Sequence, residues 1–308
     1  MREALEYWSV VFVRAVATRL PDSMVRAWGT ILGSLFYAID RPHRRVALTN
    51  LEQCFPNRSA SERRAIARAT FAHFGQVLLK LLTFSALTPE QMLERAEYEG
   101  DERVRLAYAK GKGVLFFTGH FGFWECQAIA HGAKLRPIGV LARSLDNSRL
   151  NDLLERIRTG TGNHVIYRQG AVRRVLKTLA AGQGVALLID QHMHSSDAIW
   201  VSFFRRPAAT TSTLAAIALR TGAAVIPVFA EPLPGGRYRF IYEAPVEPPP
   251  DGPDAIREFT QRCTDVLEMH VRKKPELWLW MHRRWRDTPA PDAPGMFPKA
   301  RDEDVRDE

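Results

Sequence analysis

Apolar and polar positions alternate in blocks along the middle of this chain. Short, continuous apolar runs are separated by stretches in which apolar residues recur at the 3.6-residue spacing of a helix. Such alternation is typical of an α/β protein with a mostly parallel sheet flanked by helices. Strands are predicted at residues 113–119, 135–143, 164–168, 184–190 and 223–231, with an edge strand at 235–246 and a closing helix at 253–272.

The N-terminal third has a different pattern. Residues 59–82 are predicted to form a helix, with Ser61 as its N-cap and Arg64 at the position where a capping box would carry Glu. Two apolar segments, 7–13 and 27–39, precede it, and each is shorter than the roughly 20 residues of a bilayer-spanning helix. These two segments are therefore predicted to form helices that do not span a bilayer.

Arginine flanks both apolar segments: Arg14 follows the first, and Arg41, Arg44 and Arg45 follow the second. Short apolar helices bordered by arginine are typical of proteins that lie on a membrane interface. An ordinary packed helical hairpin is the alternative, and a cleaved secretion signal is disfavoured. We therefore expect a helical, membrane-associating region at 1–90, an α/β domain at 91–287 and a disordered charged tail at 288–308.

Charge narrows the choice of partners. The chain has 43 Lys and Arg against 34 Asp and Glu, a net charge of +9, which suits an anionic membrane surface, nucleic acid or an acidic carrier protein. Nucleic acid is disfavoured because aromatic residues are not interleaved with basic ones on a strand face. Cys54, Cys126 and Cys263 are far apart in the sequence, so they are expected to be thiols in a reducing compartment.

Polar residues end four of the predicted strands. His120, Arg143, Arg168 and Asp190 follow one another at intervals of about one βαβ unit. Because right-handed crossovers bring the carboxyl ends of parallel strands to one edge of the sheet, these side chains are expected to meet there. The sequence therefore predicts a ligand site at this edge.

The segment "TGHFGFWE" (118–125) contains a candidate general base. If His120 lies on the turn after the strand and Glu125 in the first turn of the next helix, the two side chains can meet, and Gly119 and Gly122 allow the tight backbone. A carboxylate bonded to one imidazole nitrogen fixes the tautomer and makes the other nitrogen a better base. Since G-x-S-x-G and P-loop patterns are absent from the sequence, His120 is predicted to act on a substrate hydroxyl.

The His120-x4-Glu125 segment resembles the H-x4-[DE] motif of the glycerolipid and lysophospholipid acyltransferase superfamily. More closely, the chain resembles the bacterial lipid A biosynthesis lauroyl/myristoyl acyltransferases. Further blocks that carry the resemblance are residues 44–57, 140–143, 187–192, 201–229 and 278–286.

This resemblance implies acyl transfer from an acyl carrier protein or acyl-CoA thioester to a hydroxyl of a glycolipid acceptor. A lipid A precursor is the leading acceptor, and a phosphatidylinositol mannoside or a lysophospholipid are alternatives. The thioester is a co-substrate, and no cofactor or metal is implied. The expected location is the cytoplasmic face of the cell inner membrane.

Residue roles also follow from the resemblance. His120 is expected to be the general base and Glu125 the partner that orients it. Arg143 is expected to bind phosphate or the oxyanion, and Asp190 to hold the site together or to contact the sugar. Independently of the resemblance, Arg168 at its strand end is a further candidate for substrate binding, with an ordinary polar strand end as the alternative, and Gln191, next to Asp190, is another.

Aromatic residues near the motif suggest where the acyl chain binds. Phe123 and Trp124, with Phe121, are expected to line an acyl slot, and packing in the helix core is the alternative. Near the C-terminus, "MHRRWR" (281–286) is expected to place its arginines, with Trp280 and Trp285, at the membrane interface, or else to cap the last element.

Two other function classes remain open at this stage. Asp190, His192 and His194, with Gln191, His120 and Glu125, offer enough ligands for a zinc or two-metal hydrolase. A non-catalytic protein that binds membranes or nucleic acid is the second alternative.

Overall fold

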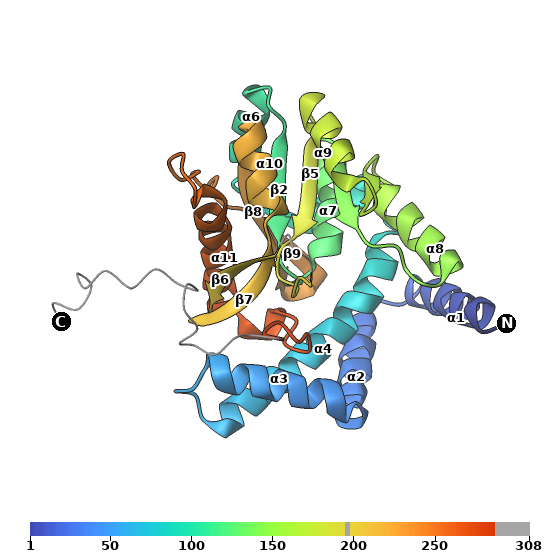
Figure 1. Cartoon of the computed structure of the whole chain (residues 1–308). Helices are drawn as coiled ribbons and strands as arrows, with labels where there is room; N and C mark the ends of the chain where they lie inside the picture. Colours follow the sequence, from blue (N-terminus) through green and yellow to red (C-terminus); the bar gives the residue numbers. More distant parts are fainter. Residues whose placement is uncertain (195–197, 287–308) are drawn as a thin grey trace.

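A seven-stranded sheet forms the centre of the computed structural model, which describes residues 1–194 and 198–286 (Figure 1). The strand order is β1-β9-β8-β2-β5-β3-β4, and every neighbouring pair is parallel except β8 and β9. This confirms the predicted α/β class. The strands are β1 (Ala96–Glu99), β2 (Val114–Thr118), β3 (Ile138–Ala142), β4 (His164–Tyr167), β5 (Gly184–Leu188), β8 (Ala224–Leu233) and β9 (Arg237–Tyr242).

Two features of the strands differ from the prediction. Residues 235–246 were expected to include an edge strand, but β1 pairs with the outer side of β9 and is itself the edge strand. None of the four residues of β1 is fully buried, so its sequence has no apolar run that would predict a strand. A separate antiparallel hairpin forms from β6 (Ala198–Phe203) and β7 (Arg206–Thr211). Its turn places Phe204 and Arg205 at positive φ, which hydrophobic periodicity does not reveal.

Helices cover both faces of the sheet. Alternate residues of β2 point to opposite faces, so Phe116 packs with helices α6 (Asp101–Ala109), α7 (Trp124–Lys134) and α8 (Ser148–Thr159). Phe117 packs on the other face with α9 (Ala171–Ala180), α10 (Thr213–Thr221) and α11 (Ala255–Lys273). All five residues of β2 are buried, which is why this strand has a continuous apolar sequence.

The N-terminal helices lie together beside the sheet (Figure 1). They are α1 (Arg2–Ala17), α2 (Asp22–Ile39), α3 (Arg41–Cys54) and α4 (Ala60–Phe84). The short α5 (Pro89–Glu94) follows them and packs on α7, and two short 3-10 turns, Pro234–Gly236 and Pro275–Leu277, occur later. The predicted N-cap of α4 was Ser61, but the N-cap is Ser59. Ser59 and Glu62 form a reciprocal capping box, which fixes the start of the helix there.

Glycines allow α2 and α4 to pack at close range. A Cβ atom on Gly33 would lie 2.0 Å from the backbone oxygen of Phe71, and one on Gly75 would lie 2.1 Å from the oxygen of Gly29. The two helices therefore touch backbone to backbone. This contact buries one side of α2, and the other side of the helix faces outward.

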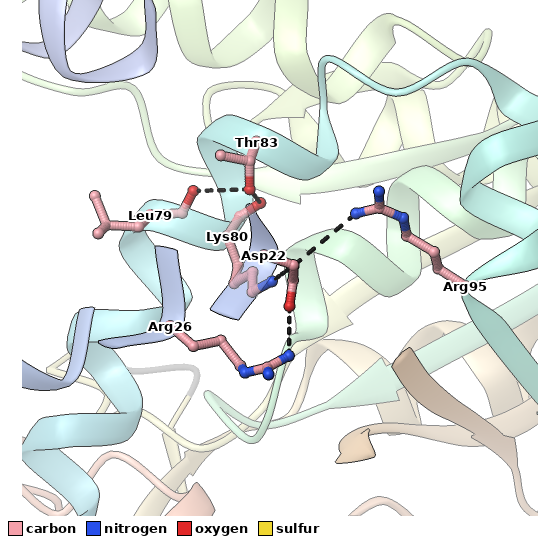
Figure 2. Close-up of polar contacts among 6 residues, drawn as sticks. All are labelled: Asp22, Arg26, Leu79, Lys80, Thr83 and Arg95. Carbon is pink, nitrogen blue, oxygen red and sulfur yellow. Dashed lines mark hydrogen bonds and ion pairs between the residues drawn. The ribbon is translucent and has the colours of Figure 1, made fainter. Parts of the chain in front are cut away.

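A polar cluster joins the same helices to the α/β domain (Figure 2). The carboxylate of Asp22, at the start of α2, contacts the amine of the buried Lys80 on α4 and the guanidinium of Arg26. Arg95, just before β1, lies 3.9 Å from the same carboxylate. Within the described residues, no helix combines the length and apolar character needed to cross a membrane.

Candidate active site

The turn after β2 is fixed by close backbone contacts. Gly122 has φ +58°, and a Cβ atom there would lie 1.6 Å from the oxygen of Ala230. The N–H of Gly122 donates to Leu277 O (2.9 Å), and the N–H of Leu279 donates to His120 O (3.2 Å). The glycine-dependent turn that the sequence predicts is therefore present, and it holds His120 at the carboxyl end of the strand.

His120 is paired with a carboxylate from the neighbouring strand. Asp190 follows β5, which lies next to β2 in the sheet. Asp190 Oδ1 accepts from His120 Nδ1 (2.9 Å), and Oδ2 accepts from the His120 backbone N–H (2.7 Å). The indole Nε1 of Trp278 donates to Oδ2 as well (2.9 Å). Gly119 makes room for this contact, because a Cβ atom there would lie 2.9 Å from Asp190 Oδ2.

The electrostatics of the pair keep Asp190 ionised. Burial tends to raise the pKa of Asp190, but the charge of His120 and three hydrogen bonds hold it at about 2. For His120, burial tends to lower the pKa, but the charge and hydrogen bond of Asp190 outweigh it, so the pKa is raised. With Nδ1–H donated to Asp190, the neutral ring presents an unprotonated Nε2, which lies 3.4 Å from the amide nitrogen of Gln191.

Glu125 has a different partner from the one predicted. It lies in the first turn of α7, as expected, but its carboxylate forms a two-pronged ion pair with Arg158 of α8. The hydrogen bond to the His120 ring comes from Asp190 instead. The physical reason is that α7 starts beyond the turn and directs Glu125 toward α8, whereas Asp190 lies beside His120 on the adjacent strand. Glu125 still raises the pKa of His120 through its charge.

A cleft of about 550 Å³ opens above this pair. His120 lines it together with Arg143, Arg168 and Gln191, so the predicted meeting of strand ends at one edge of the sheet is confirmed. Arg143 forms an exposed ion pair with Asp146 (3.2 Å). Asp190 lies behind His120, with 2% of its side chain exposed.

An apolar cavity adjoins the cleft between the sheet and α7. Trp124, Leu141 and Leu188 line both spaces, and the cavity extends inward to His131 and Tyr242. Trp124 also lies against the His120 ring, with 5.2 Å between ring centroids. The Glu125–Arg158 ion pair lines both spaces too, so it stands at the boundary between them.

Phe123 does not have the expected position. It is 2% exposed and packs against His73 and Tyr238, each at 5.1 Å between ring centroids. Phe121 is fully buried against Phe229. Both are core residues because the turn directs them away from the cleft, and Trp124 is the aromatic residue of this segment that borders the cleft.

The segment 278–286 is buried beside the site and does not form a membrane belt. Trp278 and Trp280 are inaccessible, and Trp285 is 8% exposed. Arg284 is 1% exposed and its guanidinium donates to Ala209 O and to Thr210 Oγ1. The interface prediction for these residues was wrong because their apolar and cationic groups are satisfied inside the protein, although Arg283 and Arg286 are exposed.

Two residues of this segment belong to the site and were not predicted to do so. Trp278 holds Asp190, and His282 Nε2 accepts a hydrogen bond from the backbone N–H of His192 (3.1 Å). Burial lowers the pKa of His282 to about 4, so its ring stays neutral and can accept this bond. Their proximity to strand ends about 90 residues earlier leaves no signal in a single sequence.

A metal site receives no support from these positions. Across residues 1–194 and 198–286, no group of three or more His, Cys, Asp or Glu side chains is arranged to hold a metal ion. Both oxygens of Asp190 are already used by His120 and Trp278. The metal-dependent hydrolase therefore lacks a ligand set in the described part of the chain.

Fold and site together define a class: an α/β protein with a histidine–carboxylate pair at the carboxyl edge of its sheet, beside an apolar cavity. The chain belongs to the bacterial lipid A biosynthesis acyltransferase family, which it matches over residues 1–287. It is thus an acyltransferase of lipid A biosynthesis, as the sequence motifs indicated.

Named relatives support the same assignment. The lipid A biosynthesis lauroyltransferase of Escherichia coli (strain K12) is 27% identical over 286 residues, which cover 92% of each chain. The myristoyltransferase of the same strain is 24% identical over 253 residues, 81% of this chain and 77% of that protein. A lipid A biosynthesis acyltransferase of Haemophilus influenzae is 24% identical over 290 residues, 90% of this chain and 87% of that protein.

Proposed function

We propose that this protein transfers a fatty acyl group from an acyl carrier protein or acyl-CoA thioester to a hydroxyl of a lipid A precursor. The observation that carries this proposal is the placement of His120. Its Nδ1 is held by the buried Asp190, and its ring lines a cleft that adjoins an apolar cavity. This arrangement suits a base that acts on a polar hydroxyl while an acyl chain lies beside it.

In the proposed reaction, His120 Nε2 takes the proton of the acceptor hydroxyl as its oxygen attacks the thioester carbonyl. A tetrahedral intermediate forms, its C–S bond breaks, and the new ester C–O bond remains. The imidazolium then gives its proton to the departing thiolate. Asp190 is a positioning residue, because it fixes the tautomer and stabilises the imidazolium.

Cationic residues of the cleft suit the rest of the acceptor. Arg143 and Arg168 line the cleft from the ends of β3 and β4, and a guanidinium fork binds two oxygens of a phosphate at once. We assign these two residues to acceptor phosphates. The Gln191 side-chain amide lies 3.4 Å from His120 Nε2, so it is a donor within reach of the reacting atoms.

The acyl chain is assigned to the apolar cavity between the sheet and α7. Trp124, Leu141 and Leu188 border both the cleft and the cavity. The cavity has a volume of only about 60 Å³, so a chain attached at the thioester carbonyl enters it only when the surrounding side chains, the Glu125–Arg158 pair among them, move apart. The relatives are named for lauroyl and myristoyl transfer. We propose that the inner end of the cavity, at His131 and Tyr242, limits the length of the acyl chain that this protein transfers.

Membrane association is proposed through α1 and α2. Outward apolar residues recur at helical spacing on both helices and stay exposed in the structure: Leu5, Trp8, Phe12 and Val16 on α1, and Met24, Trp28, Ile31, Leu32, Leu35, Phe36 and Ile39 on α2. An apolar stripe of this kind suits the interface of a bilayer. We place the protein at the cytoplasmic face of the inner membrane, where it can reach both a lipid acceptor and a soluble thioester.

Replacing the proposed base tests the mechanism. His120→Ala removes Nε2 from the cleft, so acyl transfer should fall by about 10²–10⁴-fold or more. The circular dichroism spectrum should be unchanged, although Tm should fall because the buried Asp190 loses a donor. Purified variant and parent are compared with a lipid A precursor and an acyl carrier protein thioester. Parent-like turnover by His120→Ala would falsify the mechanism.

Mass spectrometry of total lipids from cells with and without the gene identifies the acceptor and acyl chain together. A lipid A species that loses one acyl group without the gene is expected. Loss of an acyl group from a phosphatidylinositol mannoside or a lysophospholipid, with lipid A intact, would replace the proposed acceptor.

A further inference from the structure

A second basic depression lies away from the His120 cleft. It has a volume of about 340 Å³ and is lined by Arg45, Arg206, Arg283 and Arg286, with Thr49 and Trp285. We name it the arginine pocket. None of these residues lines the His120 cleft, so its cations are additional to Arg143 and Arg168.

The segment 280–282 connects α3 to the loop that lines the His120 cleft. On one side, Asn50 of α3 donates from Nδ2 to Trp280 O and to His282 O, both at 2.9 Å. On the other side, the His282 ring accepts from the backbone of His192, which lines the His120 cleft. The arginine pocket is therefore held between α3 and this segment by direct hydrogen bonds.

Three arginines of the pocket lack an ion pair within the described part of the chain. Among the described residues, no Asp or Glu lines the pocket. Arg45, Arg206 and Arg283 form no ion pair within residues 1–194 and 198–286, whereas Arg158 is paired with Glu125 and Arg272 with Glu268. Like charges gathered in one depression repel each other, and an anion placed among them relieves this repulsion.

One of the arginines is held in a fixed position. The guanidinium of Arg206 lies over the Trp285 ring, 5.0 Å from its centroid, and burial lowers its pKa. A cation that is stacked and partly buried loses less freedom when it binds a ligand than a fully mobile surface arginine does. The arginine pocket therefore has the features of a preformed anion-binding site.

We propose that the arginine pocket binds a phosphate group. Planar guanidinium groups pair with two phosphate oxygens at once, and several can surround one phosphate or diphosphate. A space of this size admits a small phosphorylated group. The inference does not depend on the proposed acyl transfer, since binding can be measured without turnover.

Two sources share this chemistry: a soluble phosphate compound and the head group of a bilayer phospholipid. Isothermal titration with inorganic pyrophosphate at low salt measures the first. Sedimentation with phosphatidylcholine vesicles, with or without phosphatidylglycerol, measures the second. Both use the full-length protein.

The decisive variant is Arg45→Gln/Arg283→Gln, which changes two exposed side chains of the pocket. Its control is Arg64→Gln/Arg173→Gln, which removes the same net charge from exposed positions outside the pocket. The pocket variant should bind pyrophosphate at least about tenfold more weakly than the parent, because charge-assisted hydrogen bonds are lost. The control should stay within about twofold of the parent.

Arg283→Lys adds a test of geometry. It keeps the charge but loses the fork, so its affinity should fall between those of the parent and the double variant. Thermal unfolding confirms that each variant is folded.

The vesicle measurements identify the source. Weaker retention of the pocket variant on phosphatidylglycerol vesicles, with competition by pyrophosphate, supports the lipid head group. Unchanged retention combined with weakened pyrophosphate binding supports a soluble phosphate compound. Failure of the parent to bind pyrophosphate at millimolar concentration, or equal binding by parent and pocket variant, would overturn the proposal.

Discussion

At the scale of single residues, the candidate site depends on how one buried carboxylate is satisfied. Asp190 is 3% exposed, and an ionised carboxylate in such a place is costly unless donors surround it. The His120 ring, the His120 backbone and the Trp278 indole supply them. The same contacts fix the imidazole in the orientation that a general base needs.

Asp190→Asn should change both the rate and its pH dependence. In the proposed mechanism His120 acts as a base in its neutral form, so kcat/KM should rise with pH through the raised pKa of that residue. Removing the Asp190 charge should move this inflection to lower pH and reduce turnover by about 10²–10⁴-fold. The measurement is a pH profile of the purified enzyme.

Glu125→Gln is the matched comparison. Among the groups that change the pKa of His120, Glu125 has the smallest effect. Its inflection should stay close to that of the parent. An unmoved inflection in Asp190→Asn, or a larger shift in Glu125→Gln, would contradict the assignment of Asp190 as the partner of His120.

Adjacent arginines near the C-terminus should differ sharply in their effect on stability. Arg284 is buried and donates to Ala209 O and Thr210 Oγ1, whereas Arg283 is exposed. Arg284→Leu should lower the free energy of unfolding by about 2–4 kcal/mol, because the buried Thr210 Oγ1 loses this donor and Ala209 O is left with the backbone N–H of Met193 alone. Arg283→Leu should change it by less than about 0.5 kcal/mol. Urea unfolding monitored by tryptophan fluorescence measures both, and similar losses would show that burial is not the cause.

At the scale of elements, the α2–α4 contact reverses a common expectation. Replacing a glycine by alanine inside a helix ordinarily stabilises it, by roughly 0.5–1 kcal/mol. At Gly33 the added Cβ would lie 2.0 Å from Phe71 O, a backbone atom that cannot rotate away.

Gly33→Ala should therefore destabilise the protein by about 1–3 kcal/mol, because the helices must separate. Ser34→Ala, at the neighbouring exposed position of α2, should have an effect within about 0.5 kcal/mol. Thermal unfolding compares the two variants. A rise in Tm for Gly33→Ala would mean that the helices are not in backbone contact.

At the scale of the whole molecule, the exposed apolar residues are concentrated on the N-terminal helices. Trp28 and Ile31 of α2 are 60% and 64% exposed. Their side of the helix is opposite to the glycines that contact α4, so nothing in the described chain covers it. The cleft and this surface belong to one molecule whose acceptor is a lipid.

Polar replacement on this surface should weaken membrane binding. Trp28→Ser/Ile31→Ser should reduce sedimentation with anionic vesicles at least about tenfold, since each buried apolar side chain contributes roughly 1.5–3 kcal/mol. Leu106→Ser is the control, because Leu106 is equally exposed (67%) but lies on α6. Equal retention of all three proteins, or full activity without lipid or detergent, would contradict the proposed location.

The sequence by itself determined the class of the fold and the region of the site. Continuous apolar runs can be buried only between two layers of helices, and polar residues at the ends of parallel strands must meet at one edge. The gathering of His120, Arg143 and Arg168 in one cleft follows from these local rules. Gly119 and Gly122 also predicted the turn. A side chain at 122 would be strained, and one at 119 would be too close to Asp190.

Only the tertiary structure decided which carboxylate pairs with His120. The register of β2 and β5 aligns Thr118 with Leu188, which brings the residues two positions further, His120 and Asp190, side by side. Spacing along the chain favoured Glu125, but register between strands 70 residues apart is set by the packing of the whole sheet. The same holds for Arg284 and Trp285: the arginine-rich segment 281–286 suggested a membrane surface, and long-range contacts place both residues inside the protein.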